Sequence, residues 1–394
     1  MTSVTMLKPD HSGRRRYDLF TEEHDDLRAS IRRFVSTELT PHIDEWEASG
    51  FPDSVFTRLG ACGFLGLDKP EEYGGQGGDF LSELILCEEL YYGANGGLAM
   101  GVGVQVDMAM PPILAFGTEE QKQQWAVPAI AGEKVLCLGI SEPDAGSDVA
   151  AIKTRAARDG DDWVINGTKT YITNGIRADV IVLVTKTDAD AGYDGFTLFL
   201  VPMDTPGVTR STRLEKLGMH ASDTALITFE DVRVPDSAVL GTVGKGFYQI
   251  MWELQGERLS GCAGNIAAAQ RAFDLTLKYA KERETFGKPI GHHQAIRHRL
   301  AEMAIKLEAG RELTYATARR MVAGEYPVRE VSMTKVFTCR AANEVVDECV
   351  QIHGGAGYMK EFGVERLWRD IRLSRIGGGT DEIMLDVVGK SFGL

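Results

Sequence analysis

The sequence is poor in cysteine and in positive charge, and it has no long apolar run. Its six cysteines form no C-x-x-C pair and lie inside apolar segments, which predicts reduced, buried thiols in a cytoplasmic compartment and no disulfides. The 43 Lys and Arg against 57 Asp and Glu leave a net charge of −14, which argues against a nucleic-acid partner. Apolar runs such as residues 180–184 are far too short to cross a membrane, so no membrane insertion is expected.

Several common functional motifs are also missing. The chain has 44 glycines, but no G-x-G-x-x-G follows a predicted strand, which argues against a Rossmann dinucleotide site. Gly-Lys-Ser at 389–391 lacks the first glycine of a P-loop, and no elbow motif anchors a Ser-His-Asp triad. His292, His293 and His298 are not spaced as paired ligands on one helical face, so no metal site is expected.

The remaining pattern predicts an α+β protein with three domains. Residues 1–16 are interpreted as a mobile lead-in, because their basic cluster is not followed by the apolar core of a secretory signal. Helical periodicity dominates residues 17–134, where Pro41 marks the end or a bend of the first helix. Short β-branched and aromatic segments fill residues 135–240, and helical periodicity returns in residues 241–394.

The two later domains allow the elements to be placed. Strands are expected at 135–140, 162–175, 180–186, 196–202 and 224–235, and long antiparallel helices at about 246–284, 291–322 and 328–352, with a shorter one at 380–390. Asn166-Gly167 predicts a two-residue hairpin turn, because such a turn needs positive φ at both positions.

A run of three glycines, residues 377–379, stands directly before the last predicted helix. Thr380 can cap that helix, Asp381 and Glu382 suit the positive end of its dipole, and the side-chain-free backbone leaves N–H groups open to a ligand. On these residues alone, a ligand-receiving helix start and a simple flexible connector remain equally open.

Glu257 and Arg258 lie on or beside the apolar stripe of the helix that follows Gly246. Neither has an opposite charge three or four positions away, so no pair within the helix explains them. Two interpretations remain open. One is a long-range structural salt bridge, and the other is a carboxylate turned into an apolar cavity, where desolvation would raise its pKa and suit it to proton abstraction.

Five turn motifs follow one another along the chain. They are SEPDAGSD (141–148), YITNG (171–175), RETFGKPI (283–290), QIHGGAGY (351–358) and RIGGGTDEI (375–383). In this order and approximate spacing the sequence closely resembles the acyl-CoA dehydrogenase family, from about Phe20 to the C-terminus. The resemblance implies an N-terminal helical domain, a β-barrel-like middle domain and a C-terminal four-helix bundle. It also implies FAD between the last two domains and a neighbouring subunit that completes its site, in a homotetramer or at least a dimer.

The resemblance further implies the residues that contact the ligands. Ile140, Ser141, Ser147, Tyr171 and Thr173 would lie at the flavin, and Ser147 would also meet the CoA portion. Arg283, Phe286, Gln294, Gln351, Gly354 and Gly355 would contact the FAD phosphates and adenosine across the subunit interface. Thr380 and Glu382 would hold FAD after the glycine run. Helix starts and open backbone N–H groups can receive a pyrophosphate without a Rossmann fingerprint.

The implied activity is α,β-dehydrogenation of an acyl-CoA thioester to the trans-2-enoyl-CoA, with FAD as hydride acceptor and an electron-transfer flavoprotein as the next acceptor. Many family members carry the catalytic glutamate where this chain has Gly378. A minority, resembling the isovaleryl-CoA and long-chain branches, place it where this chain has Glu257. We therefore expect Glu257 to be the base, Arg258 to support the substrate end of the site, and the Gly378 N–H to face the thioester oxygen.

The substrate and the class of reaction leave alternatives. Glycines at 377 and 378, with Gly96, Gly97 and Met100, predict an open pocket wall that favours branched or medium-to-long acyl chains. An acyl-CoA oxidase or a flavin monooxygenase on the same scaffold is one alternative. A catalytically silent protein that binds acyl-CoA or FAD is the other.

Overall fold

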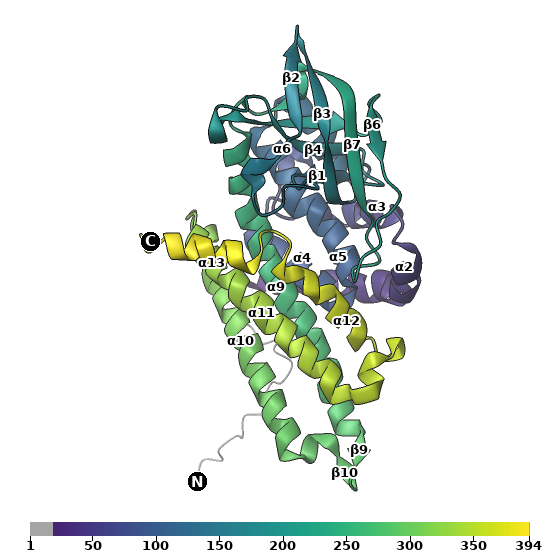
Figure 1. Cartoon of the computed structure of the whole chain (residues 1–394). Coiled ribbons are helices and arrows are strands. Elements are labelled where there is room, and N and C mark those ends of the chain that lie inside the picture. The colour runs from purple at the N-terminus through teal and green to yellow at the C-terminus, as the bar shows by residue number, and fades with distance from the viewer. Residues whose placement is uncertain (1–18, 394) are drawn as a thin grey trace.

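The computed structural model describes residues 19–393, so the predicted lead-in at residues 1–16 lies outside the described residues. A sheet occupies one end of the molecule, N-terminal helices lie against it, and long C-terminal helices extend away from it (Figure 1). The three predicted layers, helical, then sheet, then helical, are confirmed.

The N-terminal part is built from short helices around an apolar core. Its α-helices are α1 (Glu22–Phe34), α2 (Ile43–Ser49), α3 (Ser54–Ala61), α4 (Phe80–Gly93), α5 (Gly96–Gly103), α6 (Met110–Phe116), α7 (Glu119–Gln121) and α8 (Val127–Ile130). Near Pro41 the chain bends and does not leave the helical conformation, because the π-helical turn Val35–Leu39 and a 3₁₀ turn lead directly into α2. The helix α4 is buried over most of its length and lies along α9 (Gly246–Glu282).

One helical stretch, Gly96–Phe116, is long and apolar enough to cross a membrane by length and composition alone. It comprises α5, the π-helical segment η5 (Val104–Ala109) and α6. Of its most apolar window, 61% is buried inside the protein, as expected for a core helix.

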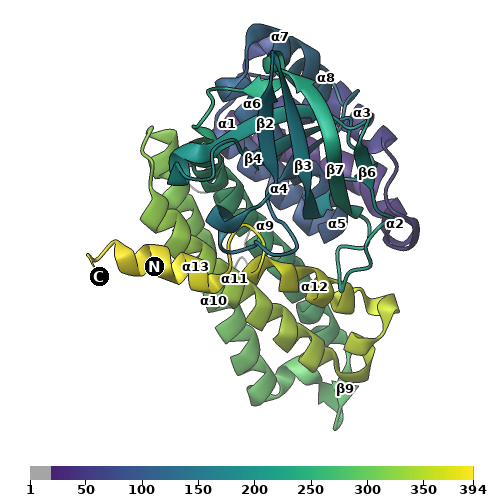
Figure 2. The ribbon, with the colours of Figure 1, turned by 45° about the horizontal axis from the view of Figure 1, so that its top comes forward.

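The middle part is an eight-stranded mixed sheet. Its strands are β1 (Leu136–Gly139), β2 (Arg155–Asp159), β3 (Asp162–Thr173), β4 (Val180–Lys186), β5 (Phe196–Pro202), β6 (Val208–Arg210), β7 (Thr224–Pro235) and β8 (Val239–Leu240). The main order is β6-β7-β3-β2-β4-β5-β8, with β1 parallel to β4. The long strands β3 and β7 run side by side across the sheet (Figures 1 and 2).

The hairpin predicted at Asn166-Gly167 is wrong. Both residues lie inside β3, where the register with β7 shifts in a bulge, and the Asn166 side chain bonds with Asp231 of β7. The two-residue turn is instead Gly160-Asp161 between β2 and β3, where Gly160 has φ +65°. Positive φ at Gly is needed at both a turn and a bulge, so the dipeptide alone did not distinguish them.

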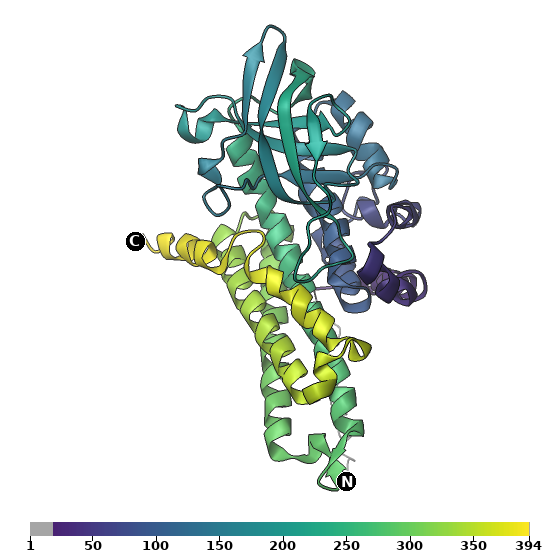
Figure 3. The same ribbon diagram turned by 45° about the vertical axis from the view of Figure 1, so that its right-hand side comes forward.

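The C-terminal part is dominated by three long helices. Its elements are α9, the short hairpin β9 (Glu284–Thr285) and β10 (Lys288–Pro289), α10 (Gln294–Val322), α11 (Val328–His353), α12 (Val364–Ile371) and α13 (Asp381–Lys390). The hairpin lies at the end of the bundle farthest from the sheet (Figures 1 and 3). The short helix α13 lies at the end of the bundle nearer the sheet, and α12 lies alongside α9 and α11 farther down, with the glycine run between α12 and α13 (Figure 1).

Five of the six cysteines are buried, and all six are free thiols. Cys62 is exposed, which corrects the prediction that every thiol is buried. It follows the last turn of α3, where the chain leaves the apolar core that holds Val55, Phe56 and Leu59.

Candidate active site

Glu257 of α9 lies directly opposite the glycine run. A Cβ atom added to Gly378 would lie 3.0 Å from the Glu257 Oε1 atom and 3.5 Å from the Lys335 Cε atom. Gly378 has φ +64° and Gly379 has φ +100°, a backbone conformation that side chains disfavour. Glycine at 378 therefore leaves room for a carboxylate that arrives from a helix 121 positions earlier in the chain.

Two cations hold the glycine run against α9 and α11. Arg258 Nε donates to the Gly378 carbonyl at 2.8 Å, and Lys335 Nζ donates to the Gly379 carbonyl at 2.6 Å. Both are buried, so each is an anchor and not a surface charge. Arg258 therefore bonds to a backbone carbonyl and not to a distant carboxylate, which argues against the interpretation of Glu257 and Arg258 as members of structural salt bridges.

Burial raises the pKa of Glu257 above the ordinary glutamate value, and the charges of Arg258 and Lys335 limit the rise. The Gly378 N–H makes no hydrogen bond to any acceptor within residues 19–393. A carboxylate of raised pKa beside a free backbone donor is an arrangement that can remove a proton and stabilise the negative charge that develops.

The start of α13 is held by the Thr380 cap and by Asp381. The Thr380 hydroxyl accepts from the Ile383 N–H, which confirms the predicted cap. Asp381 is buried and pairs with Arg340 at 2.9 Å and Arg375 at 2.8 Å. Burial opposes ionisation of Asp381, yet the hydrogen bonds from both arginines hold its pKa below the usual value. Glu382 is exposed, and Asp381 is thus the acid that anchors the helix.

A buried ion pair places the SEPDAGSD turn beside the end of β3. Lys169 is fully buried, and its Nζ donates to Glu142 at 2.8 Å and to the Ile140 carbonyl at 2.9 Å. Glu142 also accepts from the backbone of Lys153 and Thr154. Burial lowers the pKa of Lys169 to about 8, although Glu142 opposes this.

This turn and the end of β3 bring together the residues predicted to face the flavin. The Thr170 N–H donates to the Ser141 carbonyl at 2.9 Å. Tyr171, near the end of β3, has φ +60° and is 74% exposed, and Ser147 is exposed in the SEPDAGSD turn. A bulky residue held in this strained conformation with its ring in solvent indicates a functional contact.

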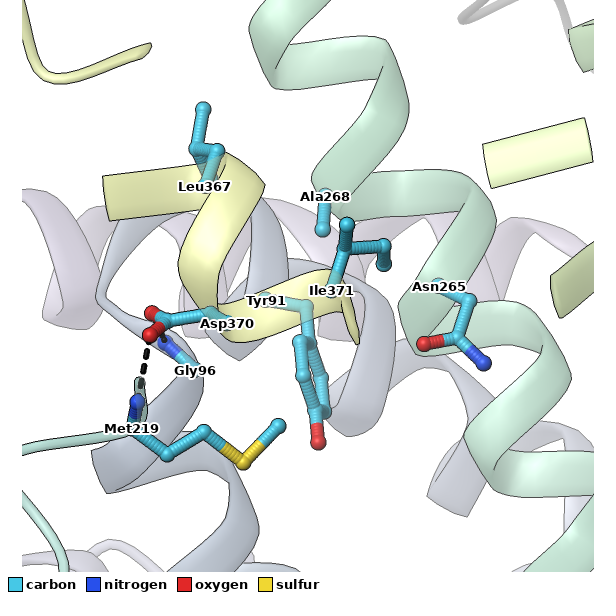
Figure 4. A pocket seen from close by; sticks show the side chains of 8 residues that line it. All are labelled: Tyr91, Gly96, Met219, Asn265, Ala268, Leu367, Asp370 and Ile371. Atoms are coloured by element: carbon cyan, nitrogen blue, oxygen red, sulfur yellow. Dashed lines mark hydrogen bonds between the residues drawn. The ribbon is translucent and has the colours of Figure 1, made fainter. Parts of the chain in front are cut away.

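Asp370, which precedes the glycine run, joins all three parts of the chain. Its carboxylate accepts from the Met219 N–H at 2.5 Å and from the Gly96 N–H at 3.2 Å (Figure 4). The cavity beside it, lined also by Tyr91 and Asn265, has room for about one water molecule. Burial raises the pKa of Asp370 to about 6. The cavity lies where the three parts of the chain meet, and it is too small to receive a substrate.

The remaining predicted cofactor residues lie at the other end of the bundle. They are Arg283, Phe286, Gln294, Gln351, Gly354 and Gly355, and all six are exposed. Phe286 is 95% exposed with φ +50°, at the tip of the β9–β10 hairpin. Stacking of Tyr279 on His353, with ring centroids 4.4 Å apart, fixes the end of α11 beside the end of α9.

The two groups of predicted residues are therefore not brought together within one chain. Between Glu257 and Arg283 the continuous helix α9 rises about 39 Å at 1.5 Å per residue. That is longer than one extended dinucleotide. A single chain offers the flavin-side residues at one end of its bundle and the phosphate-side residues at the other.

Sequence reasoning missed several residues of the site. Lys335, Asp370 and the Glu142–Lys169 pair each make bonds between residues far apart in the sequence, 44, 151 and 27 positions respectively. Lys335 lies within the buried face of α11, and a lysine in such a stripe was a usable signal. Within residues 19–393, no three His, Cys, Asp or Glu side chains gather as ligands for a metal ion.

The residues present fit FAD. Added Cβ atoms at Gly354 and Gly355 would meet nothing within 4 Å, so the backbone there is open to close approach. Tyr171 and Phe286 hold exposed rings in strained conformations, and hydroxyls, an arginine and a helix start supply donors for a ring system and a pyrophosphate.

The fold and this site together describe a flavin-dependent oxidoreductase. Comparison with known proteins agrees. Family models match all three parts: the acyl-CoA dehydrogenase N-terminal domain at residues 21–133, the middle domain at 137–232 and the C-terminal domain at 244–393.

Individual relatives match over almost the whole chain. The probable acyl-CoA dehydrogenase YngJ of Bacillus subtilis is 38% identical, over 94% of this chain and 98% of the relative. The long-chain specific acyl-CoA dehydrogenase of Mus musculus is 38% identical, over 94% and 87%. The short-chain specific acyl-CoA dehydrogenase of Bos taurus is 40% identical, over 93% and 89%.

Solved structures agree with this assignment. An acyl-CoA dehydrogenase from Geobacillus kaustophilus is 41% identical with a TM-score of 0.94, over 96% of this chain and all of that one. A glutaryl-CoA dehydrogenase from Mycobacterium smegmatis in complex with FADH2 is 34% identical with a TM-score of 0.90, over 95% of each chain. The chain belongs to the acyl-CoA dehydrogenase family, whose members dehydrogenate acyl-CoA with FAD.

Proposed function

We propose that this protein removes the α-proton of an acyl-CoA thioester with Glu257 and yields the trans-2-enoyl-CoA. The observation that carries the proposal is the position of the Glu257 Oε1 atom, 3.0 Å from the place of a Cβ on Gly378. The carboxylate thereby fills the space that a side chain at 378 would otherwise occupy. In the reaction the Cα–H bond breaks and its proton passes to Glu257, while the β-hydrogen leaves as hydride.

The surrounding residues prepare this step. Arg258 and Lys335 fix the Gly378–Gly379 backbone, so the free Gly378 N–H is held where it can donate to a thioester oxygen. The raised pKa of Glu257 makes it a stronger base than a surface glutamate. We assign the contact with the CoA portion to Ser147, which is exposed in the SEPDAGSD turn.

FAD supplies the hydride acceptor when bound. On the flavin side, Ile140, Ser141, Ser147, Tyr171, Thr173, Thr380 and Glu382 would hold it. On the phosphate and adenosine side, Arg283, Phe286, Gln294, Gln351, Gly354 and Gly355 would do so. Because about 39 Å of helix separates the two sides in one chain, we assign the second set to a neighbouring subunit, as in a homotetramer built from dimers.

The partners and location of the enzyme are part of the same proposal. We expect an electron-transfer flavoprotein as electron acceptor and a cytoplasmic location. A solved structure described as the electron transferring flavoprotein of Acidaminococcus fermentans includes a chain 36% identical to this one. For the acyl group we propose branched or medium-to-long chains, since the glycines at 377 and 378 carry no side chains next to the proposed base. Relatives named for long-chain and for short-chain substrates are about equally similar to this chain, so similarity alone does not select an acyl chain length. A panel of acyl-CoA substrates distinguishes them.

The test is Glu257→Gln, which keeps the size of the side chain and removes the base. The variant should bind FAD as the wild type does, and the rate of anaerobic flavin reduction should fall about 10²- to 10⁴-fold. Butyryl-, octanoyl-, palmitoyl- and isovaleryl-CoA serve as the substrate panel. A variant that still bleaches at a near-normal rate would show that another group is the base, and a preference for butyryl-CoA would contradict the proposed chain class.

A second candidate is an oxidase on the same scaffold. A solved prolyl acyl carrier protein oxidase, AnaB, is 29% identical with a TM-score of 0.90 over 95% of this chain. Peroxide formation in air, compared with turnover by an artificial electron acceptor, separates the two. A dehydrogenase should form little peroxide and require the acceptor.

A further inference from the structure

A second glutamate, Glu253, lies one helical turn before Glu257 on the same face of α9. It is only 3% exposed, yet neither of its carboxyl oxygens receives a hydrogen bond from any donor within residues 19–393. Neither oxygen is bonded to a cationic side chain in that part of the chain. A buried carboxylate with neither partner would be costly, so its charge state needs an explanation.

The carboxyl that follows Glu253 by one turn on the same face of α9 is that of Glu257, and each of the two groups affects the pKa of the other. Residues four positions apart on a helix lie side by side. Two ionised carboxylates only accept, and they repel each other, so a bond between them requires that one carries a proton.

The charges around the pair favour the proton on Glu253. Arg258 of α9 and Lys335 of α11 both stabilise the anion of Glu257. The charge of Arg258 also acts on Glu253, but the acid Asp107 of η5 opposes it. The charge of Glu257 also contributes to the raised pKa of the Tyr91 hydroxyl on α4. Burial raises the pKa of Glu253 well above the ordinary value, and the charge of Glu257 adds to the rise.

We propose that Glu253 is a neutral carboxylic acid that donates a hydrogen bond to the Glu257 carboxylate and so positions the catalytic base in its ionised form. Glu253 is a positioning residue, because it acts on the substrate only through Glu257. The proposal rests on the proposed function, in which Glu257 is the base. A Glu253 proton also explains why this glutamate needs no basic partner in the core.

The first experiment compares Glu253→Leu and Glu253→Gln as FAD-loaded enzymes. Flavin reduction is followed anaerobically across pH with octanoyl-CoA, or with whichever panel member reduces the wild type fastest. Leucine removes the donor, so the pKa of Glu257 should rise and the acid limb of the rate profile should move about one pH unit upward, equal to a roughly tenfold loss on that limb. Glutamine keeps an N–H donor, so its profile should stay near that of the wild type.

The opposite sign would overturn the proposal. If Glu253 were an anion, its removal would relieve repulsion, and the acid limb would move downward in Glu253→Leu. If the acid limb does not move in Glu253→Leu, Glu253 has only a structural role and the proposal is refuted. Gln255→Leu is the matched control, since Gln255 is a buried polar residue of the same helix whose side chain donates to the Met251 carbonyl. It should leave the limb in place.

A second measurement does not depend on turnover. The infrared spectrum of the holoenzyme at pH 7 should contain a protonated carboxyl band that is lost in Glu253→Gln, and absence of that difference would refute the inference. The two proposals fail separately. If Glu257→Gln still reduces flavin at a near-normal rate, Glu257 is not the base, whatever the infrared spectrum shows for Glu253. If Glu257→Gln is inactive but the spectrum contains no protonated carboxyl band from Glu253, only the proposed role of Glu253 is refuted.

Discussion

The two ends of the C-terminal bundle differ in how complete they are. At the end nearer the sheet, Glu257, Arg258, Lys335 and the glycine run make their contacts within the chain, and both cations are buried. At the hairpin end, the predicted phosphate contacts are exposed, and Phe286 holds its ring almost entirely in solvent. A strained, exposed aromatic residue indicates a missing neighbour. The proposed catalytic end is thus formed within one chain, and the exposed hairpin end is the part that we assign to the site of a neighbouring subunit.

The largest effect beyond Glu257 is expected at the hairpin end. Arg283→Glu should weaken FAD binding by about tenfold to a hundredfold, because a charge-assisted bond to phosphate is replaced by repulsion. FAD affinity of the reconstituted apoprotein measures it. Lys281→Glu, an equal charge change two residues earlier at the end of α9, is the control and should bind FAD nearly normally. If both variants lose FAD affinity equally, the effect of Arg283→Glu comes from the general change in charge and not from a specific contact with phosphate.

At the catalytic end, Gly378→Ala should lower the rate of flavin reduction about tenfold while FAD stays bound. Its left-handed φ costs an alanine about 1 kcal/mol, and the new methyl group would lie against the Glu257 carboxylate. Gly377→Ala is the matched control, because its φ is not positive and its nearest neighbour would be 3.8 Å away. If the two variants lose activity equally, the absence of a side chain at position 378 is not specifically needed for the close approach of Glu257.

The smallest effect on activity is expected at Asp370, the joint between the three parts. Its pKa of about 6 lies above the ordinary value of 3.8, so the folded state binds the proton more tightly. Its contribution to stability is therefore present below about pH 4 and declines as the pH rises through 6, by up to about 3 kcal/mol. Urea unfolding of wild type and Asp370→Asn at several pH values should show this decline in their difference. A difference independent of pH would mean that Asp370 does not titrate in this range.

The elements predicted best from sequence were those with strong periodicity. The strands β4, β5 and β7 were predicted with their observed bounds, whereas β2 was missed because only Ala156 of its five residues is buried and no alternation marks it. The short helix α12 was missed as well, since eight residues between two turns give a weak signal.

Glu257 shows where prediction of the site stops. Periodicity placed it on an apolar stripe, and burial explains why its charge state matters. Its proximity to Gly378 depends on how α9, α11 and the glycine run cross, which no local pattern encodes. Glu253 was visible four positions earlier, but a like-charged neighbour becomes informative only once Glu253 is known to be buried with neither carboxyl oxygen bonded.

The comparison between the two ends is tested most directly by hybrid enzymes. Glu257→Gln chains and Arg283→Glu chains, carrying different tags, are co-expressed, and dimers with one of each are purified and assayed for anaerobic flavin reduction. If each FAD site takes its base from one chain and its hairpin from the other, one of the two sites in the hybrid has both parts intact, and activity should return to about half that of the wild type. A hybrid no more active than the two parents would contradict the division of the site between two chains.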